Sequence, residues 1–295
     1  MNNVTQIARF PVKGFTAHIM DRVRLVPGEG VPMDRIMAVT DGTWRYEPDN
    51  YEVRYKDKFI ALMTHPKAAT LQLKADDNAL HLSISAPDGQ CFEIHVGDPG
   101  SEQPFLDFLA KFLDLPEDNR PELIRRTTGD FTDLTILDKA QAYHGSLHTA
   151  ISMMNLASVR DLGARMGDLE LDPRRLRANI CFDTGTAWQE ADWLGKYLRV
   201  GGVLAKVVMA TPRCTVTSVN PDTGERDRGI VQNLLRFYRH KNLGIYIDVI
   251  EEGEVRSGDA IEILEGDLGT HTLIDVPFNG AKLPVYVRNS WLKED

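Results

Sequence analysis

The segment Ala210–Gly224 contains the residues best suited to chemistry in this chain: a cysteine between a hydrophobic run and an Asn-Pro-Asp sequence. We predict that Val203–Met209 is a strand leading toward Cys214, and that Thr215–Val219 is a second short strand before a turn. Arg213 precedes the cysteine, and a neighbouring cation favours the thiolate, the form that attacks electrophiles or binds soft metals. A lone cysteine is more often a buried core residue, so this segment alone leaves both interpretations open.

The overall composition limits the classes of partner and site. The chain has 295 residues, of which 42% are hydrophobic and 26% charged, as in globular proteins, and its formal net charge is −9. This negative balance argues against general binding to nucleic acid or to an anionic membrane, because both need a basic surface. Three cysteines, Cys91, Cys181 and Cys214, are too few and too scattered for a disulfide framework or a four-thiolate metal site. With no signal-peptide pattern and no apolar run of about 20 residues, we expect a cytoplasmic protein.

Alternating hydrophobicity predicts that much of the first hundred residues forms strands. We expect three early strands, at Val4–Val12, Arg22–Val26 and Ile36–Thr40. The run Ala69–Val96 alternates in three segments separated by turns, which predicts an antiparallel meander with Cys91 as a strand residue. Lys13 follows the first strand and Arg35 precedes the third, and a single basic residue at either place is normally a solvent-exposed charge.

Helical spacing of apolar residues predicts three helices, which begin after Ser101, at Asn155 and at Gly229. The stretches Glu117–Arg126 and Gly129–Asp133 show no regular pattern and are expected to be loops. His144 and His148 are four residues apart, a spacing that suits a metal on a helix. Gly145 interrupts that pattern and no carboxylate follows in register, so a metal pair is disfavoured there.

A dense basic segment, Pro173–Arg177, runs into a short predicted strand, Ala178–Phe182. In an acidic protein such clustering suggests an anion site, although three arginines on a solvated loop explain the pattern equally well. Further strands are expected within Gly195–Met209 and the last hundred residues, with at most two in the tail after Asp267. The chain has no Gly-rich phosphate loop and no Gly-x-Ser-x-Gly nucleophile turn.

The order and spacing of several motifs resemble those of MOSC-domain proteins, a family named after the C-terminal domain of molybdenum-cofactor sulfurase. The first half contains Phe10-Pro11-Val12-Lys13-Gly14 and Met33-Asp34-Arg35-Ile36-Met37. The second half contains Arg177-Ala178-Asn179-Ile180, Pro212-Arg213-Cys214-Thr215 and Asn220-Pro221-Asp222-Thr223-Gly224. The resemblance covers nearly the whole chain, and within the family it is similar to the molybdenum-cofactor amidoxime-reducing component proteins.

This resemblance implies a mainly β (α+β) fold: a distorted MOSC-type β-barrel with an N-terminal β-barrel half and a few peripheral helices. The expected organisation is a MOSC N-terminal β-barrel-like region at 1–100, a helical and loop connection at 101–135, the MOSC domain at 136–270 and a C-terminal tail at 271–295.

The resemblance also implies a molybdenum-pterin cofactor of the molybdopterin type. Cys214 would be the catalytic residue and the protein ligand to the metal, and the cofactor would be held by Lys13, Arg35, Arg177, Asn179, Arg213 and Tyr246. These residue types suit the group, because a soft thiolate binds molybdenum while cations and amides bind phosphate and the polar pterin. One position departs from the family: Gly14 follows Lys13 where the reductases commonly have serine, so a hydroxyl that could bond the cofactor is missing.

We therefore expect an oxidoreductase that reduces N-hydroxylated or N-oxide-type small molecules. A separate protein would donate the electrons, because no further cysteines follow Cys214, and no nucleic-acid or membrane partner is expected. Two alternatives stay open. In one, the protein carries sulfur or handles the cofactor, with a persulfide on Cys214. In the other, it is a non-enzymatic β-barrel binding module in which Cys214 belongs to the core.

Overall fold

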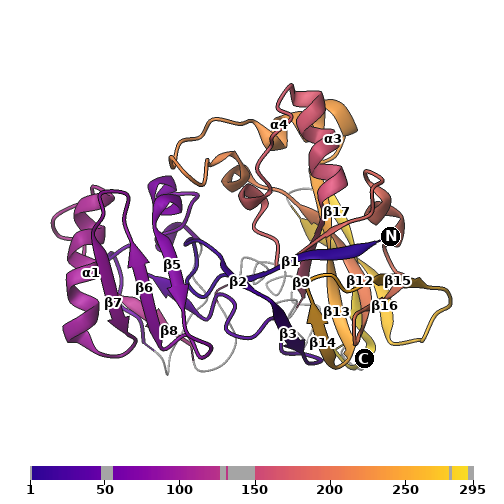
Figure 1. Cartoon of the computed structure of the whole chain (residues 1–295), viewed down its shortest axis with the longest axis horizontal. Coiled ribbons are helices and arrows are strands. Elements are labelled where there is room, and N and C mark those ends of the chain that lie inside the picture. The colour runs from indigo at the N-terminus through magenta and orange to yellow at the C-terminus, as the bar shows by residue number, and fades with distance from the viewer. Residues whose placement is uncertain (1, 48–55, 127–130, 132–149, 279–280, 292–295) are drawn as a thin grey trace.

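The computed structural model describes residues 2–47, 56–126, 131, 150–278 and 281–291. They form two lobes (Figure 1): a smaller one around α1 (Pro99–Phe112) and a larger one built on an extended, curled sheet beneath α3 (Leu156–Met166) and α4 (Ile230–Tyr238). The fold is mainly β with a few peripheral helices, as predicted.

The larger lobe contains an eight-stranded sheet in the order β15-β11-β12-β13-β9-β10-β1-β2. These strands are β1 (Asn3–Arg9), β2 (His18–Met20), β9 (Ile151–Asn155), β10 (Ile180–Asp183), β11 (Tyr197–Val200), β12 (Val203–Pro212), β13 (Asn242–Glu251) and β15 (Ile261–Leu264). Only β9 and β10 are parallel neighbours; the other pairs are antiparallel. Strand β1 is thus an inner strand of a sheet formed largely by the second half of the chain, with Ile7 opposite Ile180 and both side chains fully buried.

The smaller lobe contains the predicted antiparallel meander, β5 (Gln72–Ala75), β6 (His81–Ser85) and β7 (Cys91–His95). Helix α1 begins where the Asp98 carboxylate accepts hydrogen bonds from the amides of Gly100 and Ser101. Its apolar face, with Phe105 and Leu109, packs with the inward-facing residues of the meander into one core. The local sequence pattern therefore predicts this meander and its helix correctly.

The expectation of loop throughout Glu117–Arg126 is wrong, because β8 (Leu123–Arg125) lies within it. This strand pairs with β4 (Met37–Val39), so Ala38 faces Ile124 and both are buried. A three-residue strand has no measurable alternation of its own, and its pairing with a distant strand is what defines it. The histidine pair considered as a metal site, His144 and His148, lies outside the described residues.

The remaining helices and strands connect and cover the two lobes. Asn155, where the sequence predicts that this helix begins, caps α3 by accepting from the amide of Ala157. The 3₁₀ helices are η2 (Lys56–Lys58), η3 (Pro66–Thr70), η5 (Pro173–Leu176), η6 (Gln189–Trp193), η7 (Thr215–Ser218) and η8 (Asn289–Trp291). β3 (Arg22–Leu25) pairs with β14 (Gly253–Arg256).

The C-terminal segment adds two strands, β16 (His271–Phe278) and β17 (Ala281–Arg288), which pair as a hairpin. Val285 packs with Met209 of β12, and His271 Nε2 lies 3.0 Å from Asp248 Oδ2 in the buried region between hairpin and sheet. No helix among the described residues has the length and apolar character needed to span a membrane. The boundaries given above for the four regions remain predictions.

Candidate functional site

Cys214 lies just after the end of β12, on a segment that the sequence assigned wrongly. Thr215–Val219 is not a strand, because its first four residues form η7. The hydroxyls explain the difference: Thr217 Oγ1 donates to the Cys214 carbonyl at 2.8 Å, and Ser218 Oγ donates to the Thr215 carbonyl at 2.6 Å. Such local side-chain bonds compete with strand pairing and favour a turn. The Cys214 thiol is left exposed at the start of this turn.

The Cys214 loop, defined here as residues 213–228, connects the two lobes. Arg226 donates from Nη2 to the carbonyl oxygens of Leu62 and Met63, at 2.9 and 2.7 Å, and from Nη1 to the Thr215 carbonyl at 3.1 Å. Val219 is buried in the core of the smaller lobe. The loop that presents the thiol is therefore fixed to both halves of the protein.

Two of the three clustered arginines brace this loop. Arg175 forms two hydrogen bonds with the Asp227 carboxylate, at 2.7 and 3.0 Å, and Arg174 forms two with Asp222, at 3.0 and 2.7 Å. Hydrogen bonding from Arg175 lowers the pKa of Asp227, and burial opposes that effect. The basic segment therefore has a role that neither expectation included, as an attachment point for the Cys214 loop.

Arg213 is a buried cation next to the exposed thiol. Its side chain donates from Nε to the Leu243 carbonyl and from Nη1 to the Leu176 carbonyl, both at 2.8 Å. Its Nη2 is buried and has no hydrogen-bond partner in the described part of the chain. Burial lowers the pKa of Arg213, while Tyr246 and Cys214 act in the opposite direction. A buried donor without an acceptor is costly, so a bound polar or anionic group would be stabilised here.

Gly244 makes room for this arrangement. Its φ is +85°, and a Cβ at this position would lie 2.5 Å from the Met153 carbonyl oxygen and 3.2 Å from Arg213 Nη2. A side chain there would clash with the backbone of β9 and occupy space beside the guanidinium. The chain therefore needs glycine at the point where β13 passes Arg213.

Lys13, Arg35 and Arg177, which are far apart in sequence, meet between the lobes. Lys13 Nζ donates to the Phe131 carbonyl at 2.8 Å, and the Phe131 amide donates to the Arg35 carbonyl at 2.8 Å. The guanidinium groups of Arg35 and Arg177 lie over the Phe10 ring, 4.8 and 4.2 Å from its centroid. The structure thus brings three of the predicted site residues together.

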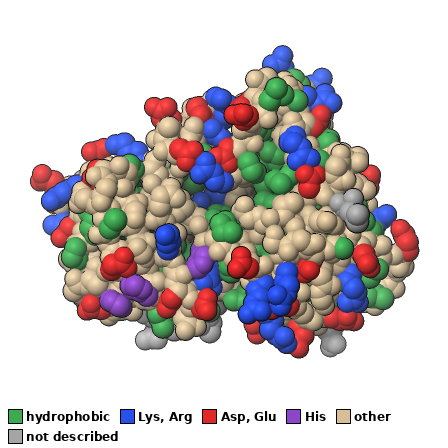
Figure 2. Space-filling view, viewed as in Figure 1, with side chains coloured by type: hydrophobic (Ala, Val, Ile, Leu, Met, Phe, Trp, Pro, Cys, Tyr) green, Lys and Arg blue, Asp and Glu red, His purple; other side chains and the backbone are tan. Residues whose placement is uncertain are grey.

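The same group continues to Arg213 through the main chain. Arg35 Nη2 lies 3.4 Å from the Arg177 carbonyl oxygen, and Arg213 holds the carbonyl of Leu176, the preceding residue. Arg35 and Arg177 both have φ of +51°, in the left-handed region that non-glycine residues seldom adopt. Strain of this kind is typical of functional sites, where the surrounding structure must hold it in place. In Figure 2, Lys and Arg side chains and hydrophobic side chains border the hollow between the lobes.

Asn179 and Tyr246 belong to the sheet beside these cations. The Asn179 Oδ1 accepts from the hydroxyl of Ser152 at 2.7 Å, and its Nδ2 donates to the Ala8 carbonyl at 3.3 Å. Tyr246 lies opposite Ser152 in the pairing of β13 with β9. The Asn179 amide thus joins β9, β10 and β1, a structural role that the sequence did not indicate; contact of either residue with a cofactor stays a prediction.

Gly14 departs from the family serine for a steric reason. Its φ is +86°, and a Cβ would lie 2.7 Å from the Ile60 carbonyl oxygen and 2.9 Å from Ala61 Cα. No side chain fits there without movement of the backbone. The close approach of the backbone of residues 60–61 therefore favours glycine at this position.

The other two cysteines differ in environment. Cys91 is an exposed residue of β7, as predicted for a strand residue. Cys181 is buried in β10, and burial raises the pKa of its thiol to about 11, while the charge of Arg213 acts in the opposite direction. Cys214 is therefore the exposed thiol that adjoins the group of cations.

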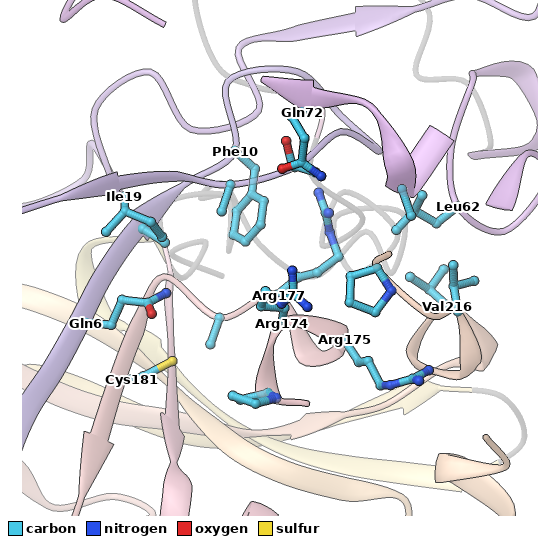
Figure 3. A pocket seen from close by; sticks show the side chains of 18 of the residues that line it. Gln6, Phe10, Ile19, Leu62, Gln72, Arg174, Arg175, Arg177, Cys181 and Val216 are labelled. Atoms are coloured by element: carbon cyan, nitrogen blue, oxygen red, sulfur yellow. The ribbon is translucent and has the colours of Figure 1, made fainter. Parts of the chain in front are cut away.

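A cavity of about 510 Å³ also lies between the lobes. Figure 3 shows Phe10 and Arg177 within it, Leu62 and Val216 on one side, and Gln6 and Cys181 on the other. Of the seven predicted site residues, Arg177 is the one that lines this cavity. Arg177 therefore belongs both to the group of cations and to the wall of this cavity.

Comparison with known proteins matches residues 140–262 to the MOSC domain. Human "Mitochondrial amidoxime reducing component 2" is 36% identical over 121 residues, which is 37% of this chain and 35% of that protein. "Molybdenum cofactor sulfurase" of Drosophila grimshawi is 31% identical over 146 residues, which is 48% of this chain and 17% of that protein. The matches thus span about a third or less of these relatives.

Among solved structures, the YUAD protein from Bacillus subtilis aligns over 89% of this chain and 96% of its own, with 14% identity and a TM-score of 0.40. The resemblance inferred from the sequence motifs is confirmed by the domain match and the two relatives. The chain therefore matches the MOSC domain over residues 140–262, which is less than half of its length.

Proposed function

We propose that this protein binds a molybdenum-pterin cofactor where Lys13, Arg35, Arg177 and Arg213 come together, with Cys214 as the protein ligand to the metal. The observation that carries the proposal is the buried Nη2 of Arg213, which has no acceptor among the described residues and lies beside an exposed thiol. One of the relatives is named as a molybdenum cofactor sulfurase, which supports this class of ligand, and another is named as an amidoxime reducing component, which supports a reductase.

The side chains that meet here suit such a cofactor chemically. The cofactor carries phosphate and polar pterin edges, which guanidinium and ammonium groups bind well. Its metal is held by sulfur, and a further thiolate is a compatible soft ligand. Gly244 leaves space beside Arg213 that a side chain would fill. Lys13, Arg35, Arg177 and Arg213 would hold the cofactor, and Cys214 would bind its metal.

When bound, the cofactor supplies two-electron redox chemistry that can remove oxygen from an N-hydroxylated substrate. The protein's own contribution is positioning and charge. Arg213 places a positive charge next to Cys214, and its bonds to the Leu243 and Leu176 carbonyls keep that charge fixed. The bonds of Arg226 and Arg175 hold the thiol-bearing loop in one place. The same proposal has three further parts. The substrate is a small N-hydroxylated or N-oxide molecule, a separate protein donates the electrons, and the protein is located in the cytoplasm.

The test is metal and pterin content after expression in a host that makes the cofactor. We expect near-stoichiometric molybdenum in the wild type and at least about a tenfold loss in Cys214→Ala, because the protein ligand is removed. Cys91→Ala is the matched control, since it removes another exposed thiol, from the other lobe. Absence of molybdenum from the wild type, or equal content in both variants, would contradict the proposal.

A second candidate is a sulfur carrier with a persulfide on Cys214. It is favoured by the match to a cofactor sulfurase over 48% of this chain and by the exposure of the thiol beside a buried cation. Intact-protein mass spectrometry separates the two candidates. An added sulfur atom on Cys214 in protein that contains no pterin would support the carrier and argue against the reductase.

A further inference from the structure

The segment that contains α4 is positively charged in an otherwise acidic protein. Between Asp227 and Asp248 the sequence has no Asp or Glu, although these two residue types number 43 in the 295 residues of the chain. The same segment contains four cations: Arg228, Arg236, Arg239 and Lys241. It therefore creates a local potential opposite in sign to the net charge of −9 of the whole chain.

The outward side of α4 combines this charge with an exposed apolar side chain. Four exposed residues follow one another at helical spacing, and we call them the α4 face: Gln232, Leu235, Arg236 and Arg239. Leu235 is 49% exposed, whereas its neighbour Leu234 is fully buried in the core beneath the helix. Figure 2 shows Lys and Arg side chains beside hydrophobic ones at the top of the molecule, where α3 and α4 lie in Figure 1. Arginine is enriched at protein interfaces, so this combination suits a docking surface.

The two arginines of the α4 face differ from most exposed arginines of this protein, which are matched with a carboxylate. Three such pairs are Arg24 with Glu252, Arg160 with Asp183 and Arg228 with Asp168. The guanidinium of Arg236 lies 5.1 Å from the centroid of the Phe237 ring. Neither Arg236 nor Arg239 forms a side-chain hydrogen bond or ion pair with any residue that the structure describes. Their charges are therefore available to a partner.

The α4 face adjoins the segment that presents the thiol. The Arg213 amide donates to the Lys241 carbonyl at 2.8 Å, just beyond the end of α4. Helix α4 also packs against η7, whose N-cap residue is Cys214. A protein docked on the α4 face would therefore lie beside the Cys214 loop, where an electron donor has to approach if Cys214 binds the metal.

We propose that the α4 face docks an acidic electron-donor protein, whose carboxylates meet Arg236 and Arg239 and whose apolar surface covers Leu235. The identity of the partner as an electron donor rests on the proposed function, but the docking itself needs no molybdenum. Nucleic acids and anionic membranes present charge over a wide area and would also meet the many carboxylates of this chain. A local pair of arginines instead suits the local acidic patch of a protein.

The test uses flavodoxin, a small acidic electron-transfer protein, as the probe. Titration calorimetry with the full chain is expected to show one-to-one binding that weakens as the ionic strength rises from about 0.01 M to 0.15 M. Arg236→Glu is expected to raise the Kd at least about tenfold, because a repelling charge replaces an attracting one. A wild type that does not bind flavodoxin at low ionic strength, or an equal Kd for Arg236→Glu, overturns the proposal.

Lys111→Glu is the matched control. Like Arg236, Lys111 is an exposed cation in the last turn of its helix, but it lies on α1 in the other lobe. Both variants change the net charge by the same amount and affect the helix dipole in the same way. Lys111→Glu is expected to leave the Kd within about twofold of the wild type. If the two variants raise the Kd equally, flavodoxin responds to net charge and not to the α4 face, and the proposal fails.

Arg239→Gly removes the second cation at low risk to the fold. Arg239 is the C-cap of α4 with φ of +64°, a conformation that glycine adopts more readily. This variant therefore tests the α4 face even if Arg236→Glu does not fold. It is expected to raise the Kd about three- to tenfold, and an unchanged Kd contradicts the proposal.

Two further measurements separate this proposal from its alternatives. Protein made in a host without the molybdenum cofactor is expected to bind flavodoxin like protein from a cofactor-making host. If the wild type contains molybdenum but does not bind flavodoxin, the docking proposal fails and the proposed function stands; docking without molybdenum gives the reverse result. Binding to phosphatidylserine vesicles that is tighter than binding to flavodoxin and is lost in Arg239→Gly would assign the α4 face to a membrane and overturn the proposal.

Discussion

Arg175 and Asp227 form an ion pair with two hydrogen bonds, in which the arginine side chain is 5% exposed and the aspartate side chain 25% exposed. The pair joins the segment before β10 to the end of the Cys214 loop. We expect Asp227→Asn to reduce the free energy of unfolding by about 3 kcal/mol, because it leaves a buried guanidinium without its carboxylate. Urea unfolding at neutral pH measures the change.

Asp222→Asn is the matched control, because Asp222 forms the same type of pair with Arg174 but its side chain is 62% exposed. Its expected cost is below about 1 kcal/mol. The pKa of Asp227 is lowered by Arg175, so the stability it gives is present above its unfolded pKa and is lost as the pH falls through the folded pKa. The cost of Asp227→Asn should therefore shrink in acid, and equal costs for the two variants would refute this assignment.

Gly14→Ser tests whether the serine of the family can be restored. We expect a loss of at least about 2 kcal/mol, because the residue must keep a left-handed φ and its Cβ meets the backbone of residues 60 and 61. Gly28→Ser is the matched control, since Gly28 has a similar φ of +81° with nothing within 4 Å of the added Cβ; it should cost only about 1 kcal/mol. Thermal unfolding measures the stability of both variants. If Gly14→Ser is as stable as the wild type, the backbone of residues 60–61 moves to accommodate the side chain, and the prediction is wrong.

The three cysteines should react with a thiol reagent in two classes. Cys214 and Cys91 are exposed and are expected to react quickly, whereas Cys181 is buried with a raised thiol pKa and should react at least about tenfold more slowly. Single Cys→Ala variants assign each phase. If Cys214 were a core residue, it would react no faster than Cys181, and the proposals for a metal ligand and for a sulfur carrier would both fail.

Cys181 should also make stability depend on alkaline pH. Its folded pKa is raised to about 11 from an ordinary value of 9.0, so between these values the unfolded thiol ionises while the folded thiol does not. Stability is then present below about pH 9 and falls as pH rises toward 11, with a slope of up to about 1.4 kcal/mol per pH unit. Tyr238, whose pKa is raised by burial, adds to the effect, so the measured quantity is the difference between wild type and Cys181→Ala in urea unfolding. Parallel curves would contradict the assignment.

Local signals predicted the parts of the fold that depend on neighbours in sequence. The meander at 72–95 follows from alternation, and the helices predicted after Ser101 and at Asn155 follow from helical spacing, although α1 begins earlier, at Pro99. The segment after Cys214 was predicted wrongly, since hydroxyl bonds of Thr217 and Ser218 override its strand propensity. Strand β8 was missed because it exists only through its distant partner β4.

The candidate site likewise has features that the sequence predicts and features that depend on the tertiary structure. The motifs supplied the residue types, but no sequence pattern indicates that Arg35 and Arg177 share the ring of Phe10. Nor does any pattern indicate that Arg213 has a buried donor with no acceptor in the described part of the chain. The bracing roles of Arg226 and Asp227 were also missed, although each is a charge in a turn-rich segment. Such roles depend on which elements the tertiary fold brings together, and single-sequence patterns do not carry that information.

The position of β1 has a consequence for how the protein is made. Ala8 receives a hydrogen bond from the side chain of Asn179, 171 positions later, and β1 pairs with β10 inside the main sheet. Strand β1 must therefore wait until more than 170 further residues have been synthesised before its partner β10 exists. Contacts of such high sequence separation slow folding and leave a hydrophobic strand unpaired during synthesis. The meander of the smaller lobe can form early, whereas the larger lobe completes its sheet only after translation has passed β10.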